Sequence, residues 1–154
     1  MAAVSHLLAR ALIAFLALPG VVAFLLPLGL VSREGFREHI NPAACVPFAA
    51  GGGLLWWCVR EFYRAGRGTL APWDPPRHLV VSGPYQWSRN PMYVAVAAIL
   101  IGWITAFPSK TIALYALAVV VAFHVRVVLF EEPWLARTHG AGWERYQARV
   151  RRWL

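Results

Sequence analysis

The chain has 154 residues, of which 59% are hydrophobic and 14% are charged. A soluble domain normally carries about 25% charged residues, so this composition excludes an ordinary soluble protein and predicts an integral membrane protein. The net charge of +8 would suit nucleic acid, but the arginines flank apolar segments and form no basic stripe. We therefore expect membrane lipids with anionic headgroups, and no nucleic acid, as partners of this charge.

Four apolar segments approach the roughly 20 residues that are needed to cross a bilayer. They cover residues 7–31, 43–59, 91–107 and 111–130. The first is longer than the apolar run of about 7–15 residues in a cleaved signal peptide. The second contains three consecutive glycines, residues 51–53, which could allow close helix packing within or between chains. The sequence predicts one all-α membrane domain over residues 1–154, with about four transmembrane helices. It does not indicate the number of chains in an oligomer.

The connection between the last two segments is only Pro108-Ser109-Lys110, which predicts a helical hairpin. Cys45 and Cys58 lie in one predicted helix, roughly 20 Å apart at 1.5 Å per residue, too far for a disulfide. The histidines never lie three or four residues apart and no CxxC motif occurs, so we expect no metal site.

The positive charges predict the orientation in the membrane. The loop after the second segment and the tail after the fourth share ten arginines, at positions 60, 64, 67, 77, 89, 137, 145, 149, 151 and 152. The opposite side has only Arg33, Arg37 and Lys110. By the positive-inside rule, loop and tail face the cytoplasm.

Two polar clusters meet at this predicted cytoplasmic interface: the turn-rich residues 83–93 and the pair Glu131-Glu132. Ionisable groups beside membrane helices are functional by default. Pro133 suggests that a helix starts here, with Glu131 nearer its cap than Glu132. A capping role for one glutamate would not explain why two carboxylates lie side by side, because like charges repel unless a cation or a hydroxyl-rich ligand is near. Arg126, about one turn earlier, could either snorkel to headgroups or bind an anion.

The tail over residues 131–154 is predicted to be helical, with a break at His139-Gly140. Beyond the break, Trp143, Tyr146, Val150 and Trp153 recur on one face of an amphipathic helix. Such a helix lies on the lipid surface, and it could also close over a site beneath it.

Residues 68–154 resemble the isoprenylcysteine carboxyl methyltransferase and phospholipid methyltransferase superfamily, in a small bacterial-type form. The matching residues are Leu79-Val80, Gly83, Tyr85, Arg89-Asn90-Pro91, Tyr93, Glu131-Glu132, Leu135, His139-Gly140, Trp143, Tyr146, Val150 and Arg152-Trp153. Asn90 stands where the prenylcysteine enzymes carry His. His139 and Trp143 replace a Phe and a Tyr of that pattern.

The resemblance implies S-adenosylmethionine as cofactor, bound between the loop 68–93 and the Glu131-Glu132 helix, beneath the tail. Cofactor contacts would fall on Arg77, His78, Leu79, Val80, Tyr85, Asn90, Pro91, Met92, Tyr93, and Glu131 or Glu132. Arg126 and Arg89 are the candidate catalytic residues. Arg126 would contact the substrate, and Arg89 could hold the cofactor carboxylate through two parallel hydrogen bonds.

The sequence thus predicts a methyltransferase of a bacterial inner membrane, with its active site facing the cytoplasm and a lipophilic acceptor entering from the bilayer. The expected acceptor is the carboxylate of an isoprenylcysteine-like or other apolar molecule, which needs no general base. A phospholipid amine is the alternative, and its proton would need Tyr93, His78 or a Glu. An NADPH-dependent reductase and a non-enzymatic lipid-binding protein are further alternatives.

Overall fold

The computed structural model describes residues 16–35, 40–66 and 78–154. Within these ranges the secondary structure is helical, with one isolated β-bridge and no strand, so the predicted all-α class is confirmed. Residues 7–15 of the first predicted span, and residues 68–77 of the predicted cofactor loop with Arg77, lie outside the described ranges.

The helices follow the predicted segments with shifted ends. Their bounds are η1 (Leu16–Leu25), α2 (Leu26–Glu34), η2 (Pro42–Ala44), α3 (Cys45–Glu61), η3 (Phe62–Gly66), η4 (Gly83–Gln86), α4 (Pro91–Ala106), α5 (Lys110–Arg126), η5 (Val127–Glu131), α6 (Glu132–His139) and α7 (Ala141–Arg149). Two stretches, Pro42–Glu61 and Lys110–His139, are long and apolar enough to cross a membrane, and α4 is shorter. The four-span topology stays a prediction.

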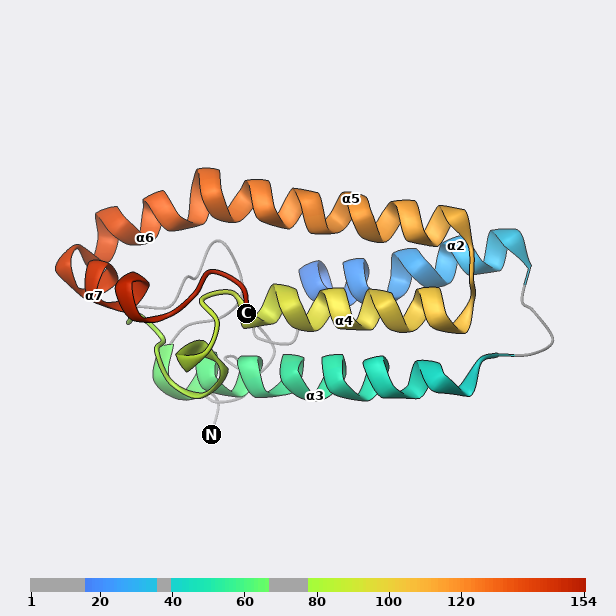
Figure 1. Cartoon of the computed structure of the whole chain (residues 1–154), viewed down its shortest axis with the longest axis horizontal. Helices are drawn as coiled ribbons and strands as arrows, with labels where there is room; N and C mark the ends of the chain where they lie inside the picture. Colours follow the sequence, from blue (N-terminus) through green and yellow to red (C-terminus); the bar gives the residue numbers. More distant parts are fainter. Residues whose placement is uncertain (1–15, 36–39, 67–77) are drawn as a thin grey trace, which may run out of the picture.

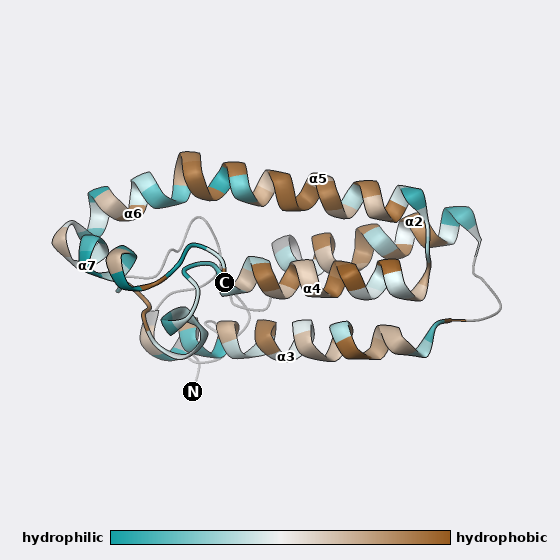
Figure 2. Ribbon diagram, in the orientation of Figure 1, coloured by the Kyte–Doolittle hydropathy of each residue, from teal (hydrophilic) through white to brown (hydrophobic). Residues whose placement is uncertain are grey.

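The long helices lie side by side, with α4 between α3 and α5 and with α2 behind it (Figure 1). The core where they meet includes Leu55, Ala95, Ile99 and Leu100, all nearly inaccessible to solvent. Gly51 permits the contact between α3 and α4, because a Cβ there would lie 2.7 Å from the Ala95 carbonyl oxygen. Hydrophobic residues dominate these helices, and hydrophilic ones gather at α6 and α7 (Figure 2).

The predicted hairpin joins α4 to α5. Ser109 starts α5 as its N-cap, with its Oγ accepting from the backbone N–H groups of Thr111 and Ile112. Such a cap satisfies two of the four N–H groups that a helix start leaves without partners.

One continuous helix runs from Lys110 through α5, η5 and α6 to His139. The prediction that Glu131 or Glu132 caps a helix start is therefore wrong, and Glu131 itself has helical dihedrals, φ −74° and ψ −49°. Proline normally breaks a helix because it lacks an N–H and crowds the carbonyl four residues earlier. Here Pro133 follows the wider π-helical turn η5, which absorbs this local misfit.

The tail differs from the prediction beyond residue 149. Gly140 breaks the helix with φ +47°, as expected from the sequence, but α7 ends at Arg149 and Val150 is extended. Residues 150–153, which we name the return segment, run back to the start of α4 (Figure 1). The reason is a competing partner: the Arg151 carbonyl accepts from the Arg89 N–H at 2.9 Å and leaves the helical hydrogen-bond pattern.

Candidate functional site

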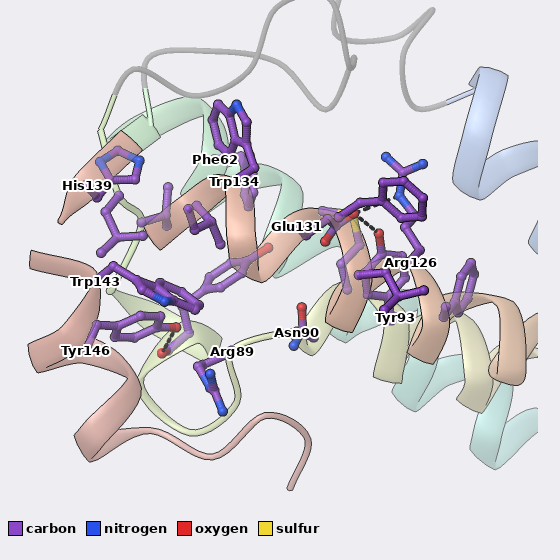
Figure 3. Close-up of a pocket in the computed structure, with 18 of the residues that line it drawn as sticks. Phe62, Arg89, Asn90, Tyr93, Arg126, Glu131, Trp134, His139, Trp143 and Tyr146 are labelled. Atoms are coloured by element: carbon purple, nitrogen blue, oxygen red, sulfur yellow. Dashed lines mark hydrogen bonds and ion pairs between the residues drawn. The ribbon is translucent and has the colours of Figure 1, made fainter. Parts of the chain in front are cut away.

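A cavity of about 640 Å³ lies between residues 78–93, the α5–η5–α6 helix and α7. Figure 3 shows side chains from all three parts pointing into it. Its volume falls within the range of roughly 300–1,000 Å³ that is usual for small-molecule sites. Pro19 and Val22 of η1 close another side.

Most of the residues expected from the sequence line this cavity. They are His78, Leu79, Val80, Tyr85, Arg89, Asn90, Met92, Tyr93, Arg126 and Glu131. Pro91 and Glu132 do not line the cavity. Pro91 is buried at the start of α4, and Glu132 forms ion pairs with arginines. Arg77 lies outside the described residues.

The first polar cluster joins Tyr93, Arg126 and Glu131 (Figure 3). The Arg126 Nε donates to Glu131 Oε1 at 2.7 Å, and the Tyr93 hydroxyl donates to the same oxygen. Arg126 and Glu131 are five residues apart, and the π-helical turn η5 brings this spacing onto one face. The Tyr93 ring packs against Phe123, with 4.4 Å between the ring centroids. The cluster therefore presents one oriented carboxylate to the cavity.

The second polar cluster joins Arg89, Glu132 and Arg152. Arg152 donates from Nε and Nη2 to the two oxygens of Glu132, each at 2.8 Å, and Arg89 Nη1 lies 2.9 Å from Glu132 Oε1. These hydrogen bonds raise the pKa of Arg152 above its usual value. Glu131 and Glu132 thus pair with different arginines, which removes the repulsion expected between them.

The Arg89 guanidinium also contacts an aromatic ring and carries a buried N–H group that no described residue accepts. Its guanidinium carbon lies 5.6 Å from the centroid of the Trp143 ring, a cation–π arrangement. Its buried Nε has no hydrogen-bond acceptor among the described residues. A buried donor without an acceptor costs free energy unless a ligand or water satisfies it.

The loop wall of the cavity is held from two sides. The Tyr146 hydroxyl donates to the Tyr85 carbonyl at 2.7 Å, and burial raises the pKa of Tyr146, which keeps this donor protonated. On the α3 side, Ser82 Oγ donates to Glu61 at 2.6 Å. Gly83 has φ +58°, and a Cβ there would lie 2.7 Å from the Glu61 side chain, so only glycine suits this turn.

Sequence reasoning missed several cavity residues. Phe62, Phe123 and Trp134 line the cavity as apolar groups, and nothing distinguishes them from lipid-facing residues in the sequence. In the sequence, Arg152 belongs only to the family-like pattern of the tail. Its ion pair with Glu132, 20 residues earlier, is visible only in the tertiary structure.

A family model described as phospholipid methyltransferase matches residues 43–142. The chain belongs to the phospholipid methyltransferase family. This family lies within the superfamily whose resemblance the sequence suggested, so that recognition is confirmed. The match begins in η2, just before α3, which is earlier than the resemblance expected from the sequence, and it ends before Trp143 and the return segment. No curated protein and no solved structure matches the chain significantly.

Membership in the phospholipid methyltransferase family, together with the two long apolar helices, indicates a membrane methyltransferase. The reductase and the non-enzymatic alternatives have no comparable support. Among the described residues there is no cluster of three or more metal-ligating side chains.

Proposed function

We propose that this phospholipid methyltransferase family member uses S-adenosylmethionine to methylate a lipophilic acceptor in the 640 Å³ cavity. The observation that carries the proposal is the pairing of two complementary polar groups in one apolar cavity. Glu131 offers an oriented carboxylate, and Arg89 offers a buried N–H that has no acceptor in the part of the chain that the structure describes.

The residues present fit such a methyl donor. It carries a carboxylate, an ammonium group, a ribose diol and a sulfonium cation. Arg89 Nε is placed to donate to the carboxylate. Aromatic side chains of the cavity, Tyr85 and Trp143 among them, provide apolar surface for the adenine. When bound, the donor supplies an electrophilic methyl group on a positively charged sulfur.

Two acceptor chemistries are candidates, and the Arg126–Glu131 ion pair favours an amine. A carboxylate acceptor would need Arg126 for itself, but Glu131 already compensates that charge at 2.7 Å. An amine needs a proton acceptor, and Glu131 is one. Both contacts to Glu131 from the described residues involve Oε1, which leaves Oε2 able to accept a proton. The phospholipid methyltransferase model points the same way, and the isoprenylcysteine-type carboxylate is the second candidate.

In this proposal the chain itself supplies positioning and proton transfer. Arg126 and Tyr93 hold Glu131 in one orientation. Glu131 would take one proton from the ammonium form of the acceptor, which leaves the nitrogen lone pair free for the electrophilic methyl group that the bound donor would supply. The proton would then reside on the Glu131 carboxyl group. The apolar walls exclude water, which strengthens these electrostatic contacts.

The acceptor would enter from the bilayer, close to Leu129 and Phe130. Both side chains line the cavity and are also exposed, at 61% and 65%. Exposed apolar residues on a helix long enough to span a membrane face lipid tails. The distribution of arginines supports a cavity that faces the cytoplasm, and the membrane that we propose is a bacterial inner membrane.

The test of the proposed function begins with ligand binding to detergent-purified protein. Calorimetric titration with S-adenosylmethionine and with NADPH should give a signal for the first alone. A signal for NADPH alone, or for neither, would overturn the proposal.

The acceptor is identified by transfer of a labelled methyl group to membrane lipids, followed by treatment with alkali. A methyl ester releases volatile labelled methanol, whereas a methylated amine keeps its label. Retained label in a phospholipid would establish the amine, and released methanol would establish the carboxylate.

A further inference from the structure

The return segment, residues 150–153, makes its contacts with the loop that forms one wall of the cavity. The Arg151 carbonyl accepts from the Arg89 N–H at 2.9 Å. The Arg152 carbonyl accepts from Asn90 Nδ2 at 3.0 Å and from Ser88 Oγ at 3.4 Å. In Figure 1 this segment passes from α7 to the beginning of α4. Segments more than 60 residues apart in the sequence are thereby joined through backbone carbonyls.

The Arg152 side chain secures this arrangement through Glu132. One carboxylate receives two guanidinium groups, Arg152 from the return segment and Arg89 from the loop. Bidentate contact between a guanidinium and a carboxylate is the strongest form of ion pair and fixes geometry as well. The loop, α6 and the return segment therefore meet at Glu132.

Exposure differs along this chain of charges. The side chains of Arg89 and Glu132 are 12% and 15% exposed, whereas that of Arg152 is 36% exposed. The inner pair is shielded from solvent, and the outer guanidinium is reached by water and ions. Salt should therefore weaken the outer contact first.

Neither Glu132 nor Arg152 lines the cavity, but the groups that they hold do. Arg89 and Asn90 line it and contact the return segment directly. We propose that Arg152 is a positioning residue: by binding Glu132 it keeps the return segment on the loop, and so keeps Arg89 oriented for the methyl donor. This inference rests on the proposed function and assigns Glu132 to holding the protein together, not to touching the donor.

Arg152→Gln tests the proposal, with Arg151→Gln as the matched control. Arg151 is exposed and contributes only backbone contacts among the described residues. Hydrogen exchange measured without ligand should be about tenfold faster at residues 87–90 and 150–153 in Arg152→Gln, because a charge-assisted pair is lost. Arg151→Gln should exchange as the wild type does. Unchanged exchange in Arg152→Gln, or equal acceleration in both variants, would overturn the proposal.

Donor binding supplies the second measurement. Arg152→Gln should bind S-adenosylmethionine about tenfold more weakly, with kcat at saturating donor nearly unchanged. Arg152→Lys should restore part of the affinity, since an ammonium keeps the charge but cannot reproduce the bidentate fork. Faster exchange with wild-type affinity, or a loss confined to kcat, would overturn the positioning role.

If Arg152→Gln does not fold, the salt dependence of donor affinity still tests the proposal. Affinity of the wild type for the donor should fall more steeply than that of Arg152→Lys as salt rises to about 1 M, where the Debye length is about 3 Å. Parallel salt dependences would contradict the proposal. Absence of any donor binding in the wild type would instead overturn the proposed function, and hydrogen exchange would still decide whether Arg152 holds the return segment.

Discussion

At the scale of single residues, the two neighbouring glutamates have different surroundings. Glu131 points to the cavity and is held by Arg126 and Tyr93, while Glu132 points to Arg89 and Arg152. Adjacent positions on a helix differ by about 100° in direction, since a turn holds 3.6 residues. This separation predicts distinct consequences for the same substitution at the two sites.

Glu131→Gln should lower the rate of methyl transfer by roughly ten- to hundredfold. The amide cannot take the acceptor proton, and it loses a charge-assisted hydrogen bond to Arg126 worth about 1.5–3 kcal/mol. The measurement is single-turnover transfer of a labelled methyl group. Glu144→Gln is the control, because Glu144 is exposed on α7. A wild-type rate of methyl transfer in Glu131→Gln would show that Glu131 takes no part in the reaction.

Arg126→Ala should weaken acceptor use and leave donor affinity nearly unchanged. The guanidinium holds Glu131 at 2.7 Å, on the side of the cavity away from Arg89. We expect a ten- to hundredfold loss in kcat/KM for the acceptor. Arg33→Ala, on α2 at the other end of the helices, should change neither value. An equal loss of donor binding in Arg126→Ala would place Arg126 in the donor site.

At the scale of elements, the contact between α3 and α4 depends on which face each glycine occupies. Gly51 faces α4, whereas no atom of the described residues outside its own helix lies within 4 Å of where the Cβ of residue 52 would be. The possibility of close helix packing, which the sequence left open for all three glycines, is realised within the chain by Gly51.

Gly51→Ala should destabilise the protein by about 1–3 kcal/mol, because its new methyl group would meet backbone atoms of α4 that cannot move aside. Gly52→Ala should be neutral or stabilising by up to about 1 kcal/mol, since alanine favours the helix. Thermal unfolding in detergent, followed by circular dichroism, measures both. Equal stability of the two variants would contradict the packing described.

The helix from Lys110 to His139 links the hairpin end of the molecule to the cavity end. At 1.5 Å per residue, 30 residues extend about 45 Å, longer than the roughly 30 Å hydrocarbon core. The cavity residues of this helix therefore reach the membrane–water interface when its apolar part spans the bilayer. At the scale of the whole molecule, the polar groups of the site gather at the cavity end of this helix, away from the hairpin.

Cysteine labelling tests which surface this is. In a background where Cys45 is replaced by Ser, Lys110→Cys should react with a membrane-impermeant thiol reagent added to intact cells. Gly142→Cys should react only with a permeant reagent, because the positive-inside rule predicts from the arginine distribution that α7 faces the cytoplasm. Position 142 has open space for the side chain. The reverse labelling pattern would invert the proposed orientation.

The sequence alone determined the membrane character, the helical class, the hairpin at Ser109, the break at Gly140 and ten of the residues that line the cavity. These depend on local composition and on short-range signals, such as apolar length, N-caps and glycine. The tertiary structure decided three further points: that the helix continues through Pro133, that residues 150–153 leave the helix, and that Glu132 binds two arginines. Each of these depends on partners far apart in the chain or on a π-helical turn that periodicity does not reveal. A local pattern cannot predict them, because the free energies of alternative backbone paths differ by only a few hydrogen bonds, and distant residues supply those bonds.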